Sequence, residues 1–560
     1  MSEKMTVGRY LVKRLEQLNI GHVFGVPGDF VLGFMDLLVE SPALKLVGTC
    51  NELNAGYAAD AYARMRGVGA VCITYNVGGL SLLNAISGAY SESVPVIVIS
   101  GAPATGSAKR SVVPHHTSGN LNLQQSIFET VTAAAVALTD AGEAPKQIDT
   151  AITACLRRKL PVYIEIPTDM VNAPCAEPTS LLSEHDADYT DQDSLHEAVS
   201  DAVEVIESAA NPVLLVGLET ARFHLRDHLS QLLEKSGLPY ATILSTKGIL
   251  PEHQPQFIGT YAGGLLCSCA RKRIETSDCV INLGARFSDV DLLNTTAEGF
   301  PGIQAGQGFV KISRRIYENI ELGAFMRALI DKISQRQSLL GKDFLCTPEE
   351  RARICPWVER NRRTAKTAPA DHLELAMVYK HLSALLDENT LLVADTGDAM
   401  FSAAALQLKN TNSFVCQALY MSIGYSVPAT LGVCMAQPDK RVITLVGDGA
   451  FQMTCQELST IIRHKLNPVF ILINNDGYTV ERLIHEGPYN DIQQWTYHKL
   501  PQVFGESRSF DVHSERELVE ALETAKASSV TAFIEVHLER MDSSEALRTL
   551  GEGLRKRNQL

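Results

Sequence analysis

Residues 441–481 read RVITLVGDGAFQMTCQELSTIIRHKLNPVFILINNDGYTVE, and this stretch decides the fold. Its two apolar runs, residues 441–446 and 469–473, each end in a polar tip that contains glycine. Between them, residues 455–464 carry apolar side chains at helical spacing, so the stretch predicts a strand, a helix and a second, parallel strand. A right-handed crossover then places both tips at the carboxyl edge of one sheet.

The two tips carry short, oxygen-rich groups. Asp448 offers a carboxylate, Asn475 an amide oxygen, and Gly477 a backbone carbonyl that no Cβ shields. This set suits a hard divalent cation such as Mg²⁺, which also takes phosphate oxygens. Gly447 and Gly449 stand at a helix start, where backbone N–H groups are free to bind a diphosphate.

The spacing of the tips carries more information than either tip alone. A Gly-Asp-Gly tripeptide by itself is more often a plain turn. Here the second Asn of an Asn-Asn pair follows 27 residues after Asp448. With this spacing the segment resembles the cofactor-binding motif of thiamine diphosphate enzymes. The resemblance implies thiamine diphosphate held through Mg²⁺, with Asp448, Asn475 and Gly477 as metal ligands.

Composition narrows the class of protein. The 560 residues include 50 basic and 64 acidic side chains, and the net charge of −14 argues against nonspecific nucleic-acid binding. The N-terminus has no apolar signal core, and no window approaches the roughly 18 apolar residues of a membrane span. The 12 cysteines form no paired framework, so free thiols in a reducing compartment are expected. A cytoplasmic protein without a membrane partner is predicted.

The N-terminal third alternates between helical and strand patterns, as expected for a parallel α/β sheet. The predicted helices are residues 6–20, 51–64 and 78–89, and the predicted strands are residues 22–24, 44–49, 69–74 and 94–100.

Three motifs in this third extend the resemblance. They are Gly25-Val-Pro-Gly-Asp29, Cys50-Asn51-Glu52-Leu-Asn-Ala-Gly56 and His115-His116-Thr117. In order and spacing they are similar to the pyrimidine-binding domain of the pyruvate decarboxylase group, which includes indolepyruvate, phenylpyruvate and branched-chain 2-oxo acid decarboxylases. The similarity covers essentially the whole chain. It implies nonoxidative decarboxylation of a small-molecule 2-oxo acid to an aldehyde and CO₂.

The fold class implied is α/β, with three consecutive parallel-sheet domains. The expected limits are a pyrimidine-binding domain at 1–185, a middle domain at 190–345, a linker at 346–370, a diphosphate-binding domain at 371–545 and a charged helical tail at 546–560. Within the later domains, residues 191–209 are a predicted helix, and residues 212–217, 279–284 and 391–397 are predicted strands with their tips.

Five residues match the family's catalytic positions. Glu52 matches the carboxylate that hydrogen-bonds the pyrimidine ring and promotes formation of the ylide. Asp29, His115 and His116 match the acid/base set that protonates the enamine and releases the aldehyde. Glu481 matches the glutamate that reaches the reacting carboxylate. Taken singly, each has an ordinary explanation: helix-dipole complementation, surface loop histidines, or a solvated helix charge. Their coincidence with the motifs favours the catalytic roles.

Further positions match the walls of the cofactor site. Ile423 matches the bulky apolar residue that bends the cofactor into a V shape, although an ordinary core isoleucine has the same sequence appearance. The complete set of implied cofactor-binding residues is Glu52, Thr396, Asp398, Met421, Ile423, Gly447, Asp448, Gly449, Ala450, Asn475, Gly477 and Tyr478.

Four residues are expected to line the substrate pocket: Val290, Met400, Val480 and Ile484. Val290 and Met400 stand where acetaldehyde-forming relatives carry aromatic rings, and Val480 is smaller than the isoleucine common at its position. Loss of rigid rings widens a pocket. A branched, long-chain or aromatic 2-oxo acid is therefore expected as a substrate, larger than or in addition to pyruvate.

Two other functions share these motifs. A carboligase of the acetolactate synthase type has the same fold and cofactor, but Asp29 and the histidine pair provide proton donors that such an enzyme should avoid. A non-catalytic thiamine-binding protein would not need Glu52, Asp29, both histidines and Glu481 together. In the family, the site lies between two chains, so a homodimer is the expected minimum active unit and a homotetramer the expected assembly.

Overall fold

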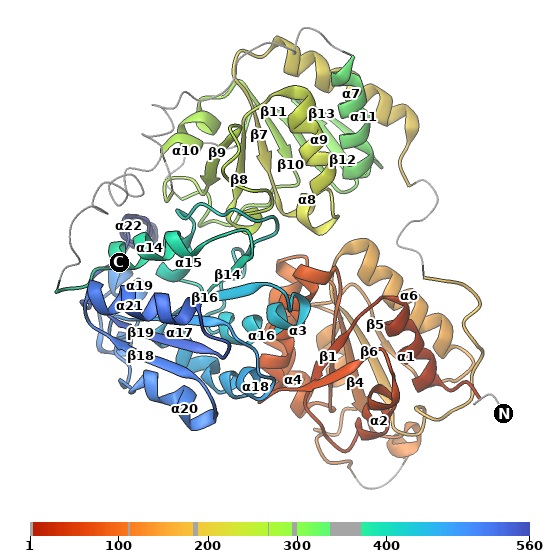
Figure 1. Cartoon of the computed structure of the whole chain (residues 1–560). Coiled ribbons are helices and arrows are strands. Elements are labelled where there is room, and N and C mark those ends of the chain that lie inside the picture. The colour runs from red at the N-terminus through yellow and green to blue at the C-terminus, as the bar shows by residue number, and fades with distance from the viewer. Residues whose placement is uncertain are drawn as a thin grey trace. The chain divides into compact units, whose positions relative to one another are not determined.

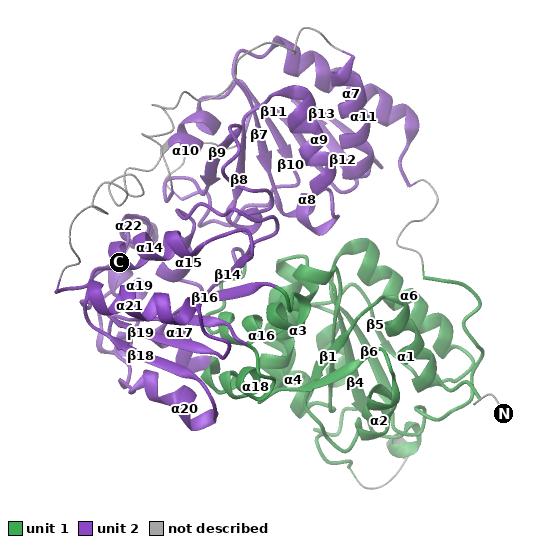
Figure 2. Cartoon of the chain, in the orientation of Figure 1, with its two compact units in different colours: residues 1–186, 420–439, 454–466 green, residues 187–419, 440–453, 467–560 purple. Residues whose placement is uncertain are grey.

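The computed structural model describes residues 4–109, 113–182, 189–266, 268–293, 299–335 and 371–559. The chain divides into two compact units (Figure 2): unit 1 comprises residues 1–186, 420–439 and 454–466, and unit 2 comprises residues 187–419, 440–453 and 467–560. The predicted linker, residues 346–370, lies outside the described residues. Among the helices of the described ranges, none has the length and apolar character needed to cross a membrane.

Unit 1 is built on a six-stranded parallel sheet. Its elements are α1 (Val7–Gln17), β1 (His22–Gly25), α2 (Leu32–Glu40), β2 (Lys45–Gly48), α3 (Glu52–Arg66), β3 (Gly69–Ile73), α4 (Val77–Ser91), β4 (Val96–Ala102), η1 (Thr105–Lys109), α5 (Leu123–Phe128), β5 (Ala135–Ala137), α6 (Ala144–Arg158), β6 (Val162–Pro167), α16 (Ser426–Ala436), η3 (Cys455–Glu457) and α18 (Leu458–Arg463). The strand order is β2-β1-β3-β4-β6-β5, and every pairing is parallel. Figure 1 shows α3 and α4 on one side of these strands and α1 and α6 on the other. Because helices cover both faces, β3, β4 and β6 are buried at every position.

Small residues allow two helices of unit 1 to approach closely. Helix α3 begins after the N-cap Asn51, whose side chain accepts a hydrogen bond from Asn54 N at 2.8 Å. It packs against α16, and a Cβ added at Gly432 would lie only 2.1 Å from the carbonyl oxygen of Ala58. The alanine-rich sequence of α3 thus holds α16, and with it residues 421–423, beside the helix that begins at Glu52.

The first sheet of unit 2 has seven strands. Its elements are α7 (Gln192–Ser208), β7 (Pro212–Val216), α8 (Leu218–Arg222), α9 (Arg226–Ser236), β8 (Tyr240–Ile243), η2 (Leu244–Thr246), β9 (Phe257–Tyr261), α10 (Ser268–Glu275), β10 (Cys279–Leu283), β11 (Gly302–Gly306), β12 (Phe309–Ile312), β13 (Arg315–Glu318) and α11 (Leu322–Ser334). The order is β13-β12-β11-β10-β7-β8-β9. Strands β11, β12 and β13 pair antiparallel, and the other pairings are parallel. The sequence did not predict this antiparallel edge.

The second sheet of unit 2 has six parallel strands. Its elements are α14 (Leu375–Leu385), β14 (Thr390–Ala394), α15 (Asp398–Ala403), β15 (Phe414–Val415), β16 (Arg441–Gly447), α17 (Asp448–Thr454), β17 (Val469–Asn474), α19 (Thr479–Ile484), η4 (Pro488–Asn490), η5 (Tyr497–Lys499), α20 (Leu500–Phe504), β18 (Arg508–Val512), α21 (Glu515–Lys526), β19 (Ala532–His537) and α22 (Glu545–Asn558). The order is β15-β14-β16-β17-β19-β18. The two strands of the opening stretch, β16 and β17, are therefore neighbours in the middle of this sheet.

The predicted α/β fold class with three parallel-dominated sheets is confirmed. The predicted helix of the tail is confirmed as α22. The crossover helix predicted over residues 455–464 begins earlier than expected, because α17 starts at Asp448 and the chain changes direction at Thr454 before η3 and α18. The domain limits remain predictions.

Candidate active site

Two neighbouring strand ends in unit 2 bring the first group of polar residues together. Strands β16 and β17 pair in parallel with Gly447 opposite Ile473, so Asp448 and Asn475 leave the sheet at the same edge. Asp448 is only 1% exposed, and Asn475 is also buried. The parallel crossover predicted from the sequence thus places both side chains at one end of the sheet, as expected for ligand-binding residues in an α/β protein.

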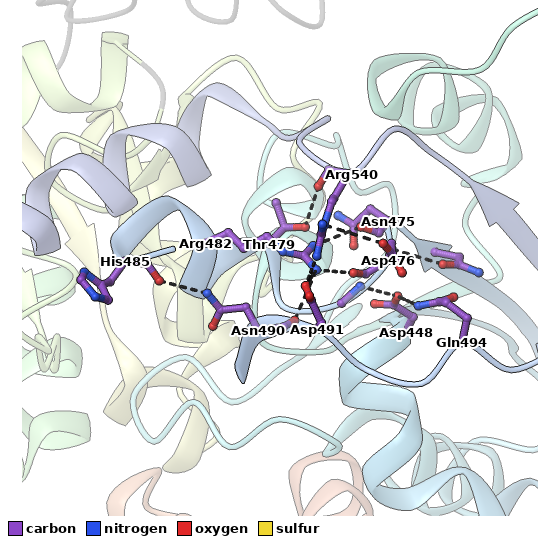
Figure 3. Close-up of polar contacts among 12 residues, drawn as sticks. Asp448, Asn475, Asp476, Thr479, Arg482, His485, Asn490, Asp491, Gln494 and Arg540 are labelled. Atoms are coloured by element: carbon purple, nitrogen blue, oxygen red, sulfur yellow. Dashed lines mark hydrogen bonds and ion pairs between the residues drawn. The ribbon is translucent and has the colours of Figure 1, made fainter. Parts of the chain in front are cut away.

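The carboxylate of Asp448 joins the two strand ends directly. Gly449 N donates to Oδ1 at 2.8 Å, Gly477 N donates to Oδ2 at 2.8 Å, and Gln494 Nε2 donates to Oδ2 at 3.4 Å (Figure 3). Burial raises the pKa of Asp448 to about 6, although the hydrogen bonds from Gly477 and Gly449 lower it. Oδ1 accepts only one of these bonds and so retains acceptor capacity that a cation could use.

Gly477 must be glycine for this arrangement. Its φ of +115° lies in the region that L side chains rarely adopt, and an added Cβ would lie 2.5 Å from the carbonyl oxygen of Asn490. Because Gly477 has no side chain, its backbone can lie close to Asn490, and in this position its N–H reaches Asp448. Within the described residues, the side chain of Asn475 beside it makes no hydrogen bond, so its amide oxygen remains available to a ligand.

The buried side chain of Arg482 fixes the loop that follows β17. The sequence patterns do not single out this residue. Its buried guanidinium donates to the carbonyl oxygens of Asn475 at 3.4 Å, Asp476, and Asn490 at 3.4 Å, and to Asp491 Oδ1 at 2.9 Å (Figure 3). Five fixed N–H donors make an arginine well suited to satisfy several carbonyls at once. Arg482 therefore fixes the backbone that carries Asn475 and Gly477. The sequence gives no signal for Arg482, because Thr479 and Glu486, which stand at helical spacing from it, are polar.

The remaining predicted residues of unit 2 lie around the ends of β14, β16 and β17. Gly447 and Gly449 flank Asp448, and a Cβ at Gly449 would lie 2.4 Å from the ring of Tyr478. Thr396 follows β14, and its buried Oγ1 has no hydrogen-bond partner among the described residues. The remaining residue of the α17 first turn, Ala450, is buried.

Asp398, a predicted cofactor-binding residue, forms hydrogen bonds within unit 2. Its Oδ1 accepts from Ser402 Oγ at 2.9 Å, and its Oδ2 accepts from Ser544 N at 2.8 Å, just before α22. Burial raises its pKa despite these bonds. Its side chain thus links α15 to the start of α22.

The other predicted residues of unit 2 differ in exposure. Glu481 is exposed on α19. Of the residues expected at the substrate pocket, Met400 is fully buried, Val480 packs 3.5 Å from the Cβ position of Gly397, and Val290 and Ile484 are half-buried.

In unit 1, the acid/base candidates form a cluster. His115 Nε2 lies 2.8 Å from Asp29 Oδ2, and one ligand atom each of Asp29, His115 and His116 lies within 4.8 Å of the others. The His115 ring stacks on Phe30 with centroids 4.6 Å apart and meets the His116 ring edge-on at 4.6 Å. Asp29 and His115 are 53% and 59% exposed, so both can exchange protons with a ligand or water.

A chain of buried hydrogen bonds holds the backbone of this cluster in place at His116. Asn76 Nδ2 donates to the carbonyl oxygen of His116 at 2.6 Å, and Asn76 N donates to Gln124 Oε1 at 2.6 Å. Gln124 Nε2 donates to Tyr163 Oη at 2.5 Å, and Tyr163 Oη donates to Glu165 Oε2 at 2.5 Å. Burial raises the pKa of Glu165 to about 7, although the Tyr163 hydrogen bond lowers it. None of the four supporting residues is signalled by a motif, because Asn76, Gln124 and strand β6, which carries Tyr163 and Glu165, lie far apart in the sequence.

Glu52 and residues 421–423 also lie in unit 1. Glu52 is the first residue of α3, and a Cβ at Gly78 would lie 3.3 Å from its Oε1. Tyr57, one turn further along α3, donates from Oη to Ser422 Oγ at 2.7 Å. This bond holds Met421 and Ile423, which flank Ser422, beside the helix of Glu52. The predicted site residues thus form two groups, one in each unit.

Comparison with known families identifies the class. The models of thiamine pyrophosphate enzymes match the chain three times: the N-terminal TPP binding domain over residues 5–127, the central domain over residues 199–333 and the C-terminal TPP binding domain over residues 395–536. Both groups of residues described above stand within or beside the two TPP binding domains. The chain is a thiamine diphosphate-dependent enzyme.

Similarity to individual proteins narrows the class further. The chain is 36% identical to pyruvate decarboxylase 1 of Oryza sativa subsp. japonica over 98% of this chain and 91% of the relative. It is 36% identical to pyruvate decarboxylase 3 of Arabidopsis thaliana over 98% and 93%, and 35% identical to pyruvate decarboxylase 1 of Pisum sativum over 98% and 92%. The chain belongs to the pyruvate decarboxylase family of 2-oxo acid decarboxylases, which are carboxy-lyases.

Replacing Arg482 with methionine is expected to weaken thiamine diphosphate binding by about 10- to 100-fold, the usual effect of removing a group that orients ligand-binding residues. Methionine retains the apolar stem but leaves three backbone carbonyls without their donor. Isothermal titration of the apoenzyme with thiamine diphosphate and excess Mg²⁺ measures the effect. Arg508→Met, an exposed arginine on β18, is the matched control. Equal affinity in Arg482→Met and wild type would contradict the role given to Arg482.

Glu165 is expected to make the stability of the protein depend on pH between about 4.5 and 7. The carboxyl has its ordinary pKa of about 4.5 in the unfolded chain and a pKa of about 7 in the folded protein, so the unfolded chain loses its proton first. Raising the pH through this window therefore favours unfolding, and the effect levels off above 7. Glu165→Gln keeps an acceptor for Tyr163 and removes the titration. Thermal unfolding of both proteins should show wild type losing stability relative to the variant from pH 5 to pH 8, whereas a constant difference would refute the assignment.

Proposed function

We propose that this protein catalyses the nonoxidative decarboxylation of a 2-oxo acid larger than, or in addition to, pyruvate, using thiamine diphosphate and Mg²⁺. One 2-oxo acid anion and one proton give one aldehyde and one CO₂. The observation that carries the proposal is the cluster of Asp29, His115 and His116, with ligand atoms within 4.8 Å of one another. Decarboxylation to an aldehyde needs a proton to be delivered and another to be removed, and imidazoles perform both near neutral pH.

The metal and the diphosphate would be held in unit 2. Asp448, Asn475 and the Gly477 carbonyl would ligate Mg²⁺, and the N–H groups of Gly449 and Ala450 at the start of α17 would face the diphosphate. Two observations support the fit. Asn475 has an unused side-chain amide among the described residues, and no described atom lies within 4 Å of the Cβ position of Gly447, which leaves open space beside the metal ligands.

Other residues would contact the remainder of the cofactor. The unpartnered Oγ1 of Thr396 and the ring of Tyr478 lie at the strand ends around the same edge, with Asp398 supporting that edge. Met421 and Ile423, held beside α3 through Ser422, would meet the cofactor's ring system. These roles rest on the resemblance and on the positions of the side chains.

Proton transfer would be divided among the carboxylates and the histidines. Thiamine diphosphate, when bound, supplies the electron sink that receives the electron pair released as CO₂ leaves. Glu52 would hold a proton at the cofactor's pyrimidine ring. His115, oriented by its contact with Asp29, and His116 would deliver a proton to the carbon that has lost CO₂ and withdraw the hydroxyl proton before the aldehyde leaves. Glu481, exposed on α19, would face the departing carboxylate.

The residues expected at the substrate pocket are aliphatic. Val290, Met400, Val480 and Ile484 bring no aromatic ring, and Val480 already packs against the glycine after Thr396. Removing a ring from a pocket wall leaves room for a longer substituent. A branched, long-chain or aromatic side chain on the 2-oxo acid is therefore the proposed preference.

Assembly and location complete the proposal. A homodimer is the proposed minimum active unit and a homotetramer the proposed assembly. In support, Val77 and Leu80 on α4 are 52% and 41% exposed and flank Gly78, which lies beside Glu52. The cysteines that the structure describes are free thiols, which fits a cytoplasmic location. The three domain limits given above belong to the same proposal.

Aldehyde release from a panel of 2-oxo acids tests the activity and its breadth. We expect kcat/KM for phenylpyruvate or 4-methyl-2-oxopentanoate to equal or exceed that for pyruvate, because the pocket residues are aliphatic. Glu52→Gln should lower kcat by at least about 100-fold, the usual contribution of a positioned proton-transfer group. Glu143→Gln, an exposed glutamate just before α6, is the control and should leave the rate unchanged.

Each alternative has its own outcome in this assay. A kcat/KM for pyruvate at least about tenfold above those of both larger acids would refute the wide pocket. An acetoin-type product without free aldehyde would indicate a carboligase. Full turnover by Glu52→Gln would contradict the catalytic role of Glu52.

Sedimentation velocity coupled to activity tests the assembly. We expect no active species smaller than a dimer. Leu80→Glu places a charge on the exposed apolar face of α4 and should lower both the dimer fraction and the activity, because burying an unpaired charge at an interface is costly. Val39→Glu, at an exposed position on α2, should change neither. An active monomer would refute the proposed dimer.

A further inference from the structure

Two neighbouring strands of unit 2 carry the same pattern of residues. Asp511-Val-His513 spans the end of β18, which stops at Val512, and Glu535-Val-His537 forms the end of β19. The strands pair in parallel with Asp511 opposite Glu535 and Val512 opposite Val536. Because alternate residues of a strand point to the same face, the two carboxylates and the two histidines project from one face of the sheet.

The nitrogen atoms of this group converge on one oxygen. His537 Nε2 lies 2.7 Å from Asp511 Oδ1, and His513 Nε2 lies 3.2 Å from the same atom. A third imidazole, that of His498 on η5, places its Nδ1 3.5 Å from it. The rings of His513 and His537 are stacked, with centroids 4.1 Å apart. Both Nε2 atoms therefore approach Asp511 from the same direction.

One of these three contacts is a hydrogen bond, that between His537 Nε2 and Asp511 Oδ1. His498 Nδ1 is hydrogen-bonded to Glu535 Oε2 at 2.7 Å, so its contact with Asp511 and that of His513 Nε2 bring two further ring nitrogens beside the same oxygen. The carboxylate of Asp511, which is 44% exposed, thus has three imidazole nitrogens around it.

A buried carboxylate supports the group from the inner side. Glu535, only 1% exposed, has Oε2 2.7 Å from His498 Nδ1 and Oε1 3.4 Å from His537 Nε2. It also accepts from His498 N at 2.8 Å and from Asn474 Nδ2 at 2.9 Å. These contacts fix the position of Glu535. Glu535 therefore holds His498 in place and adds a second carboxylate beside the Nε2 atom of His537.

We propose that His513, His537 and Asp511 form a binding site for a divalent transition-metal ion, with Zn²⁺ as the chemical type. One ligand atom of each of the three lies within 4.8 Å of the other two, close to the spacing of ligands around one ion. Two imidazoles and one carboxylate favour Zn²⁺, Co²⁺ or Ni²⁺ over Mg²⁺, which prefers oxygen ligands only. The outward positions stay open to water, since His513 and Asp511 are partly exposed.

The ion would join an edge strand to its neighbour. Strand β18 is the last strand of its sheet, and two of the three ligands lie on it or directly after it. Binding to the folded protein alone raises the temperature of unfolding in proportion to the logarithm of ion concentration. The site is independent of the proposed catalytic function, because none of its three ligands is a residue assigned to the cofactor or substrate.

Co²⁺ titration of the holoenzyme, saturated with thiamine diphosphate and Mg²⁺, tests the site. We expect one Co²⁺ per chain with the visible absorption of a four- or five-coordinate ion bound by nitrogen. Zn²⁺ should displace it. Co²⁺ that replaces Mg²⁺ at the proposed cofactor site would have oxygen ligands and would give the weak absorption of a six-coordinate ion. The absorption therefore distinguishes the proposed histidine site from the Mg²⁺ site.

Two single variants make the assignment specific. Loss of a group that only orients a ligand weakens metal binding by roughly 10- to 100-fold. His513→Gln and His537→Gln should each weaken Co²⁺ binding by more than this, because each removes a ligand itself. Each should also abolish the Zn²⁺-dependent rise in unfolding temperature. The control is His372→Gln, an exposed histidine of unit 2 whose Nε2 lies 3.5 Å from Glu374 Oε1. Circular dichroism confirms that the variants fold.

Three results would overturn the proposal. One is wild-type holoenzyme without the nitrogen-type absorption at one equivalent of Co²⁺. Another is unchanged Co²⁺ affinity in both His513→Gln and His537→Gln. The third is an equal loss of affinity in His372→Gln, which would show binding to scattered surface histidines.

Discussion

The hydrogen bond from Gly477 N to Asp448 Oδ2 is the contact on which the metal-binding end of the site depends. Parallel pairing of β16 and β17 brings the two strand ends within reach, and the register sets which face each side chain takes. A slip of one residue would turn Asp448 to the other face of the sheet. The carboxylate is almost fully buried, which disfavours its charge, and the two backbone N–H groups offset part of that cost. The site therefore holds a buried carboxylate whose remaining lone pairs are suited to a cation.

The two groups of site residues are stabilised in different ways. In unit 2, the loop after β17 is fixed by one buried arginine that satisfies three carbonyls. In unit 1, the histidine loop contains His116 at φ +62°, and the residue that bonds its carbonyl, Asn76, has φ +50°. Such conformations are costly for residues other than glycine and persist only where neighbouring contacts impose them. The buried chain from Asn76 through Gln124 and Tyr163 to Glu165 supplies those contacts.

Much of this organisation could be predicted from the sequence, because it depends on local patterns. The apolar runs and helical spacing of residues 441–481 were sufficient to predict β16, β17 and their parallel pairing. The spacing between the two polar motifs indicated Asp448 and Asn475 as candidate metal ligands. Arg482 could not be recognised, since a charged residue in a short helix is usually solvated and its burial depends on the loop carbonyls that it meets. Gln124 has the same difficulty, because it is a polar residue whose partners, among them Asn76 and Tyr163, lie far away in the sequence.

The histidines at the ends of β18 and β19 could not be predicted as a cluster either, because the cluster depends on how the two strands pair in the sheet. Asp511-Val-His513 and Glu535-Val-His537 are both visible in the sequence, but nothing local indicates that β18 pairs with β19 in the register that aligns them. Once paired, the strands bring the buried Glu535 between His498 and Asn474, and Asn474 directly precedes the proposed metal ligand Asn475. The loop after β17 is thus held from two directions, by Arg482 through its backbone and by Glu535 through the side chain of Asn474. A change in charge at Glu535 would act on the strand end itself rather than on the loop that follows it.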